Sequence, residues 1–352
     1  MPYFRNYTKN ELNIVLDKIR EARYKIIGEL SITAWVTEEP VSFDNRKTGE
    51  KKELRTGDKW GNLFDCAWFH FTADVSDEAK DKKIVLLIDV NGELCVFNSA
   101  GTPVRGLTSK ASTFSRELGA PTKRVLHISN KFSGEEKIDI WADAGCNDLF
   151  GELQENGTVK EAFIAICNDD IRSLYYDFGV LYDLIKVLDS ETARYSRIHN
   201  ALLEAGFVLK TFSHDEIQKA GNILALELQK PGGDPSLTIS AIGHAHLDLA
   251  WLWPIRETKR KGARTFATAL DLMDHYPDYI FGASQPQLFQ WMKEAYPSLY
   301  EKIKKRVKEF RLEVQGAMWV EADTNIPSGE SLIRQLFYGK EFFRNEFGRE
   351  IN

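Results

Sequence analysis

The sequence predicts a multidomain α+β protein: an N-terminal β-sandwich of jelly-roll type, a helical linker, and the first part of a parallel β/α barrel. Three observations predict this class: short strands between turns up to residue 169, helical periodicity from 170 to about 230, and strand–helix alternation after 236. We therefore expect an N-terminal helix and β-sandwich domain at 1–169, a helical linker at 170–235, and an incomplete barrel portion at 236–352.

The first region combines one helix with many strands. Leu12, Val15 and Ile19 lie at helical spacing and predict an amphipathic helix over about residues 9–29. Apolar segments that are typical of strands follow at 61–71, 83–90, 93–97, 123–128, 137–142 and 162–167. Turn signals such as Asn91-Gly92 separate them. Short strands at regular spacing favour an antiparallel sandwich, which the strand at 162–167 closes.

The second region has the period of helices. Leu181, Leu184 and Leu188 form one apolar stripe. Ser213 and Glu216 have the spacing of a capping box at the start of another helix. Prolines and glycines over 231–235 then interrupt the chain, and we place a domain boundary there.

The third region alternates strands and helices, which predicts a parallel sheet with right-handed crossovers. The expected strands are 237–243, 279–283 and 312–317, and the expected helices are 257–275, 286–296, 298–309 and 329–346. Three parallel strands rarely form a complete domain. Residues 349–352 resemble the start of a fourth strand, so we expect a fragment of a larger barrel or doubly wound domain. Its severed edge should expose apolar side chains and favour self-association.

Composition excludes several classes of function. The hydrophobic share of 43% and charged share of 28% are ordinary for a soluble globular protein. A formal net charge of −6 argues against nucleic acid or an anionic membrane as partner, and no apolar run is long enough to span a bilayer. The first eight residues lack the apolar core of a signal peptide. Four scattered cysteines without a C-x-x-C pair predict buried, reduced thiols and a cytoplasmic protein.

The most informative motif follows the strand at 237–243. His244, His246 and Asp248 alternate along the chain, so in an extended segment all three side chains can face one spot. Imidazole and carboxylate ligands suit Zn²⁺ or a similar divalent ion, and ligand sites lie at the carboxyl ends of such strands. Trp251 and Trp253 offer ring faces that suit the apolar face of a sugar. The alternative is that these polar residues are only structural.

Two carboxylates, Glu321 and Asp323, follow the third expected strand and are candidates for a catalytic pair. The alternative for Asp323 is that it caps the next helix or pins a loop, since Asp is a favoured capping and turn residue. Arg334, on the following helix, either holds a carboxylate at the site or forms a surface ion pair.

Residues 243–254, with the sequence GHAHLDLAWLWP, resemble the opening motif of glycoside hydrolase family 38, the α-mannosidases, and most closely its cytosolic/vacuolar branch. The segments at 281–287, 315–323 and 325–335 agree with the same family. The resemblance is close over 237–352 and looser over the β-rich region. It implies retaining hydrolysis of α-mannosides on a seven-stranded β/α barrel with one Zn²⁺, and an α-mannoside oligosaccharide as partner.

Carried over residue by residue, the resemblance makes His246 and Asp248 zinc ligands. His244 is not a ligand in the family pattern and becomes a supporting or packing residue, which corrects the argument from spacing. The resemblance implies that Trp251 stacks on the sugar in the metal-bound subsite and that Trp253 packs. The family nucleophile, the acid/base and the remaining ligands are expected beyond Asn352, so we expect this chain alone to be inactive. Asp323 and Glu321 are then support near the site, and Asp323 is the one catalytic candidate that remains within the chain.

The residues alone are also compatible with other functions. A metal-dependent amidohydrolase barrel also begins with His-x-His, although Asp248, Trp251 and the preceding β-domain favour the mannosidase. A non-catalytic carbohydrate-binding module would bind sugar without turnover, and a truncated product would have no function of its own. Asp65, Trp68 and Trp141 either line a sugar-binding face of the sandwich or pack in its core or interface.

Overall fold

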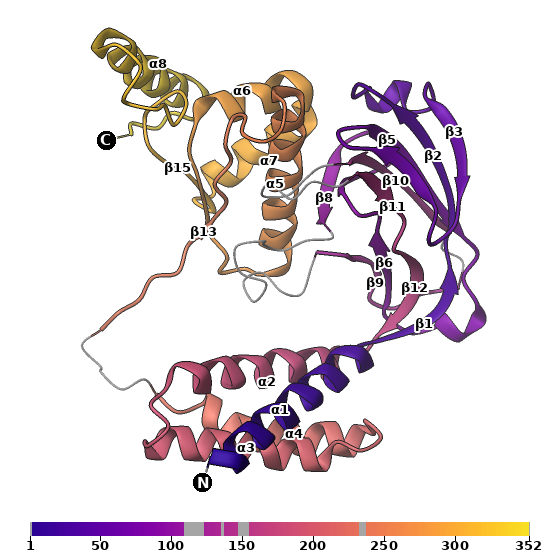
Figure 1. Cartoon of the computed structure of the whole chain (residues 1–352). Coiled ribbons are helices and arrows are strands. Elements are labelled where there is room, and N and C mark those ends of the chain that lie inside the picture. The colour runs from indigo at the N-terminus through magenta and orange to yellow at the C-terminus, as the bar shows by residue number, and fades with distance from the viewer. Residues whose placement is uncertain (1, 109–122, 135–136, 147–154, 232–236, 352) are drawn as a thin grey trace.

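The computed structural model describes residues 2–108, 123–134, 137–146, 155–231 and 237–351. A β-sandwich, a layer of helices and a mixed α/β region follow one another, each with its own apolar core (Figure 1). This arrangement confirms the predicted α+β class. None of the described helices is long and apolar enough to cross a membrane.

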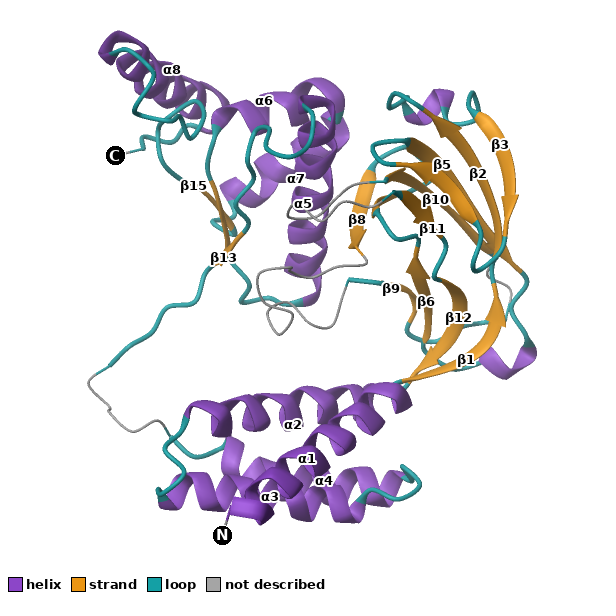
Figure 2. Ribbon diagram, viewed as in Figure 1, coloured by secondary structure: helices purple, strands orange, loops and turns teal. Residues whose placement is uncertain are grey.

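The sandwich consists of two antiparallel sheets (Figure 2). The first sheet has the order β1 (Tyr24–Glu29), β12 (Glu161–Cys167), β6 (Ile84–Asp89) and β9 (Val125–Ser129). The second has the order β3 (Glu50–Leu54), β2 (Ser31–Thr37), β5 (Cys66–Ala73), β10 (Ile138–Gly145), β7 (Glu93–Phe97) and β8 (Pro103–Thr108). A short ribbon joins β11 (Asn156–Thr158) to β4 (Lys59–Asn62), and two 3₁₀ turns lie at η1 (Phe43–Asn45) and η2 (Asp77–Ala79).

The sandwich core forms between the inner faces of the two sheets. Phe69 and Phe71 of β5 are fully buried there with Ile84 and Leu86 of β6. On the outer face of β5, Trp68 is also buried, against Phe97, with its indole Nε1 donating to the Val41 carbonyl at 3.0 Å. A strand that is covered on both faces has a nearly continuous run of apolar residues, and the sequence of β5 shows such a run.

The four helices that accompany the sandwich pack on one another. They are α1 (Pro2–Ala22), α2 (Asp169–Val187), α3 (Ala193–Val208) and α4 (His214–Leu228). Leu12 and Ile19 of α1 join Phe178 and Leu202 in one buried cluster. The capping box expected at the start of α4 is present, with Ser213 accepting from the main-chain N–H of Glu216. The segment between sandwich and barrel is therefore a packed bundle that includes α1.

This bundle differs from the sequence prediction in two respects. We expected the N-terminal helix to belong to the sandwich and to extend to residue 29, but α1 packs on α2 and α3 and ends at Ala22. Residues Tyr24–Glu29 instead form β1, which pairs antiparallel with β12. The β-branched pair Ile26-Ile27 and the following Gly28 favour a strand over a helix, and pairing with β12 decides the outcome.

The third region has a small parallel sheet, as predicted, in the order β13 (Gly243–His244), β14 (Phe281–Ala283) and β15 (Leu312–Val314). Its helices are α5 (Ile255–His275), α6 (Pro286–Ala295), α7 (Pro297–Lys308) and α8 (Gly329–Phe347). Phe266 of α5, Phe289 of α6 and Phe343 of α8 are buried together with the side chains of β14 and β15. The carboxyl ends of the three strands lie along one edge of this sheet.

Two predicted strands are not formed in the described residues. Residues 237–242 have no regular structure, and Leu237 and Ile239 are 72% and 90% exposed. Residues 349–351 are likewise outside any strand. The physical reason is pairing: within the described residues, β13 pairs with β14 alone and only through Gly243 and His244, so residues 237–242 have no partner strand for their main-chain groups. The expected exposed apolar side chains are present, whereas self-association stays a prediction.

The sandwich is fixed to the α/β region by α5, which packs on β8 and β7. At the closest approach, Gly106 of β8 donates its N–H to Thr268 Oγ1 at 3.0 Å, and a Cβ at Gly106 would lie 2.9 Å from the same oxygen. A buried ionic cluster, formed by Glu93, Asp143, Glu257, Arg260, Lys261 and Arg264, lies beside this contact. The sandwich and α5 therefore form one continuous interface.

All four cysteines are free and buried, as predicted. Burial raises the pKa of Cys66 to about 11 and the pKa values of Cys95 and Cys146 to about 12. Because the thiolate is the reactive form, we expect almost no alkylation of the native chain by iodoacetamide at pH 8 and four modified cysteines after denaturation. Mass spectrometry counts the adducts; rapid labelling of the native protein at any cysteine would contradict the packing.

Candidate metal and sugar site

The site lies where the chain leaves the parallel sheet after β13. The His246 Nε2 atom is 3.2 Å from Asp248 Oδ1, and their side chains are 55% and 43% exposed. The alternation of the motif brings these two groups together, because residues two apart lie on the same side of an extended segment. A nitrogen donor and a carboxylate oxygen thus converge at an open edge of the molecule.

The other ring nitrogen of His246 contacts a residue that follows the third strand. His246 Nδ1 is 3.0 Å from Glu321 Oε2, while Glu321 Oε1 accepts a hydrogen bond from Ser284 Oγ at 2.9 Å. Ser284 follows β14 directly. Glu321 therefore links side chains that follow the carboxyl ends of β13 and β14.

The side chain of Gln285 connects the same three segments by hydrogen bonds to main-chain groups. Its Nε2 donates to the Leu247 carbonyl at 2.8 Å, and its Oε1 accepts from the Glu321 main-chain N–H at 3.1 Å. Gln285 is only 3% exposed and has φ of 65°, the left-handed region that costs a non-glycine residue about 1–2 kcal/mol. Strained backbone at such a position is typical of functional sites. No sequence pattern had indicated a role for Gln285. Its position between the end of β14 and Pro286, the first residue of α6, was the available signal.

His246 and Asp248 fit Zn²⁺ by their donor chemistry and by their proximity, but they supply only part of a four-ligand set. Among the described residues, no group of three or more His, Cys, Asp and Glu side chains is placed to hold a metal ion. Glu321 faces the nitrogen of His246 that points away from Asp248, so it is not a third donor at the same spot. The described residues therefore supply two neighbouring ligands of a Zn²⁺ site.

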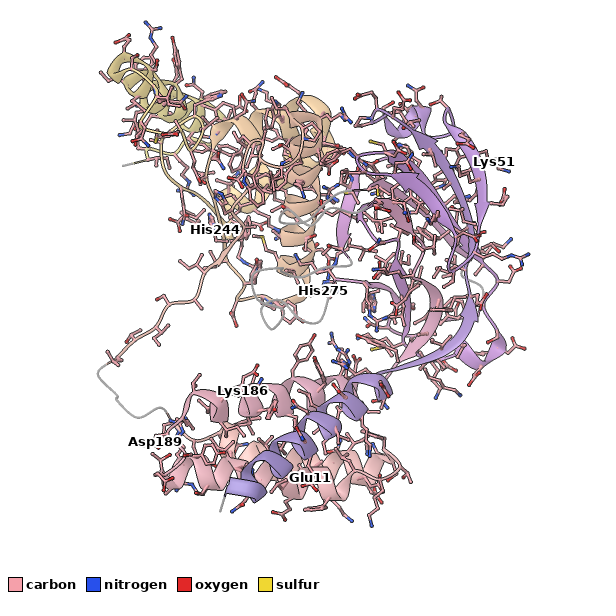
Figure 3. The ribbon with its side chains drawn as sticks, in the orientation of Figure 1. Glu11, Lys51, Lys186, Asp189, His244 and His275 are labelled. Atoms are coloured by element: carbon pink, nitrogen blue, oxygen red, sulfur yellow. The ribbon has the colours of Figure 1, made fainter. Side chains whose placement is uncertain are left out.

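The first histidine of the motif is separate from this pair. His244 belongs to β13, where it pairs with Gly282 of β14 (labelled in Figure 3). Its ring has no hydrogen-bond or ion-pair partner in the described part of the chain. The three-residue cluster expected from spacing alone is thus not formed, and only His246 and Asp248 come together.

The two tryptophans have different environments. Trp253 Nε1 donates to Thr258 Oγ1 at 3.0 Å, and Lys261 Nζ lies 4.5 Å from the Trp253 ring centroid, so Trp253 packs as expected. Trp251 is 46% exposed and meets Trp253 edge-to-face, with ring centroids 5.6 Å apart. Trp251 therefore leaves ring surface open for an apolar ligand face.

The two carboxylates of the candidate catalytic pair have different partners. Asp323 is exposed, and its Oδ1 accepts from the Asn325 main-chain N–H at 2.8 Å, so it pins its own loop. The cap of α8 is Ser328. Glu321 is directed to His246 instead. Arg334 pairs with Glu330, one turn earlier on α8, as an exposed ion pair.

The aromatic residues of the sandwich also have packing partners. Trp141 stacks on Trp35 and on the His70 ring, with centroids 5.3 Å and 4.1 Å apart. Asp65 Oδ2 accepts from the Asn62 main-chain N–H at 2.7 Å. These contacts agree with the expected packing role of Asp65, Trp68 and Trp141.

Comparison with known proteins matches two parts of the chain to described families. Residues 27–173 match the jelly roll domain of alpha-mannosidase, and residues 236–352 match the N-terminal domain of glycosyl hydrolases family 38. The second match contains His246, Asp248 and Trp251. The predicted resemblance to family 38 and the predicted jelly roll are both confirmed.

Several full-length proteins that are similar to the chain are named alpha-mannosidases. The chain is 36% identical over 383 residues to an alpha-mannosidase of Saccharomyces cerevisiae, and this alignment covers 97% of the chain and 33% of the relative. Alpha-mannosidase G of Dictyostelium discoideum is 30% identical over 89% of the chain and 29% of its own length. Alpha-mannosidase 2C1 of Mus musculus is 29% identical over 93% and 32%, respectively. The chain thus spans about a third of the length of these relatives.

Proposed function

We propose that this chain, which carries the N-terminal domain of glycosyl hydrolase family 38 behind an α-mannosidase jelly roll, supplies two zinc ligands and a sugar-stacking ring to an α-mannosidase. The observation that carries the proposal is the convergence of His246 Nε2 and Asp248 Oδ1, 3.2 Å apart, at the carboxyl end of β13. Exposed Trp251 follows three residues later along the chain. The substrate class is a terminal α-mannoside.

Each residue has a separate task in this proposal. His246 and Asp248 would hold the metal, which when bound would supply Lewis-acid polarisation of the sugar oxygens. Trp251 stacks on the apolar face of the pyranose ring. Glu321, Ser284 and Gln285 keep the segment of the two ligands in place.

Retaining hydrolysis needs a nucleophile and an acid/base carboxyl about 5 Å apart across the glycosidic bond. We assign neither role to Asp323 or Glu321, because one pins its own loop and the other holds His246. We propose that these two groups belong to the part of the relatives that this chain does not cover, and that the chain alone does not turn over substrate. The free, buried cysteines fit a reducing compartment such as the cytoplasm.

Hydrolysis of a chromogenic α-mannoside tests the proposed activity. The chain is assayed with and without added Zn²⁺, beside a form extended to the length of its relatives. We expect activity only in the extended form, and loss of that activity in its Asp248→Asn variant. Activity of the unextended chain would contradict the assignment of nucleophile and acid/base, and an extended form that cleaves no α-mannoside would contradict the substrate class.

Sugar binding without turnover is a second candidate, which the open ring of Trp251 favours. Replacing Trp251 by Ala should weaken mannose binding about tenfold or more, because stacking and apolar burial contribute about 1.5 kcal/mol or more for a covered indole. Isothermal titration calorimetry with mannose measures the affinity. Trp35→Ala removes an indole of the sandwich and is the matched control. Equal loss in both variants would point to a general defect and not to this ring.

A further inference from the structure

The ring of His246 lies between two carboxylates. Asp248 Oδ1 is 3.2 Å from Nε2, and Glu321 Oε2 is 3.0 Å from Nδ1. A neutral imidazole carries a single N–H, so only one of these nitrogens donates while the other presents a lone pair. The choice between the two tautomers decides whether Nε2 is able to bind a cation beside Asp248.

Glu321 is the more firmly held of the two acceptors. Its Oε1 already accepts from Ser284 Oγ at 2.9 Å, and its main-chain N–H donates to buried Gln285. Gln285 in turn is bonded to the Leu247 carbonyl, next to His246. The carboxylate is therefore oriented before His246 contacts it, and the contact costs little further ordering.

We propose that Glu321 is a positioning residue that places the proton of His246 on Nδ1, so that the Nε2 lone pair faces Asp248 and is ready for a divalent cation. The role toward the cation rests on the proposed function, whereas the hydrogen bond itself does not. Histidine ligands in metal sites commonly donate their other N–H to a carboxylate, which fixes the tautomer and the ring orientation. Glu321 supplies such a carboxylate from a different strand end than the ligands.

A purely structural role for the Glu321 side chain is separable by experiment. The loop at this position is held through the main-chain N–H of Glu321, which Glu321→Ala keeps, and the side chain itself is 45% exposed. We therefore expect Glu321→Ala to fold with an unchanged melting temperature. Glu313→Ala, at the exposed position of the otherwise buried strand β15, makes the same change in charge and is the matched control.

The test is the ¹⁵N spectrum of the histidine rings, recorded where a pH titration of the same signals shows neutral imidazole, with His246→Gln identifying the signal. In the wild-type chain and in Glu313→Ala we expect the proton on Nδ1. In Glu321→Ala it should move to Nε2, because Asp248 is then the remaining carboxylate at the ring. A wild-type proton on Nε2, or an unchanged tautomer in Glu321→Ala, would overturn the proposal.

Addition of Zn²⁺ separates this inference from the proposed metal site. Binding should shift the Nε2 signal of wild-type His246, and Glu321→Ala should raise the Zn²⁺ dissociation constant about 10–100-fold. A tautomer switch without any effect of Zn²⁺ on Nε2 would uphold the Glu321–His246 contact and refute the metal site. Equal Zn²⁺ affinity in wild type and Glu321→Ala would uphold the metal site and refute the positioning role.

Discussion

Replacing Arg260 by Ala should lower the free energy of unfolding of the interface between sandwich and α5 by about 3–5 kcal/mol, the usual effect of removing one partner of a buried ion pair. Arg260 is 3% exposed. Its guanidinium contacts Asp143 at 2.5 and 2.8 Å, Glu257 at 2.9 Å and the Ala144 carbonyl at 2.6 Å. The variant leaves two buried carboxylates without this partner.

The loss of free energy of unfolding in Arg260→Ala should depend on pH. Burial raises the pKa of Asp143, and Arg260 opposes the rise. Burial alone would raise the pKa of Glu257 too, but Arg264 and Arg260 hold it below its usual range. Without Arg260 both pKa values increase, so both carboxyls become protonated at a higher pH. Protonation removes the unpaired buried charge, and the loss in Arg260→Ala should therefore become smaller as the pH falls.

Urea unfolding followed by tryptophan fluorescence at pH 7.5 and pH 5 measures both effects. Arg334→Ala is the control, because Arg334 forms an exposed pair with Glu330 and should change the free energy of unfolding by about 0.5 kcal/mol or less. A loss below about 1 kcal/mol in Arg260→Ala, within the range of an ordinary surface pair, would show that the cluster does not stabilise the interface. A loss of free energy of unfolding that grows toward low pH would contradict the ionised state assigned to Asp143 and Glu257.

The second large effect concerns the two proposed metal ligands. His246→Ala and Asp248→Asn should each weaken Zn²⁺ binding by more than about 100-fold, since loss of a supporting residue alone costs 10–100-fold. His244→Ala is the matched control, because the neighbouring histidine lies outside the pair. Competition with a chromogenic zinc chelator measures the dissociation constants. Equal affinity in all three variants, or loss in His244→Ala alone, would disprove the ligand assignment.

Local signals in the sequence predicted much of the fold. The capping box at Ser213 and Glu216 and the proline that begins α6 act within one helical turn, so they are readable without tertiary information. The alternation of strands and helices after 236 likewise predicted the parallel sheet. The unformed strand at 237–242 and the position of α1 depend on which neighbours are available, which no local pattern contains.

In the candidate site, too, local sequence signals predicted some contacts, whereas others depend on the tertiary fold. Spacing predicted that His246 and Asp248 converge, because both lie on one extended segment. Spacing also included His244, which the pairing of β13 with β14 separates from them. The contacts of Glu321 and Gln285 join residues that are 36 or more positions apart, and they arise only when three strand ends meet.

Anomalous diffraction at the zinc absorption edge, from crystals of the chain grown with Zn²⁺, tests whether His246 and Asp248 together hold one zinc ion. We expect one strong anomalous peak in contact with His246 Nε2 and Asp248 Oδ1, with Glu321 on the opposite side of the imidazole ring. A peak elsewhere in the chain, or none at this pair, would contradict this expectation.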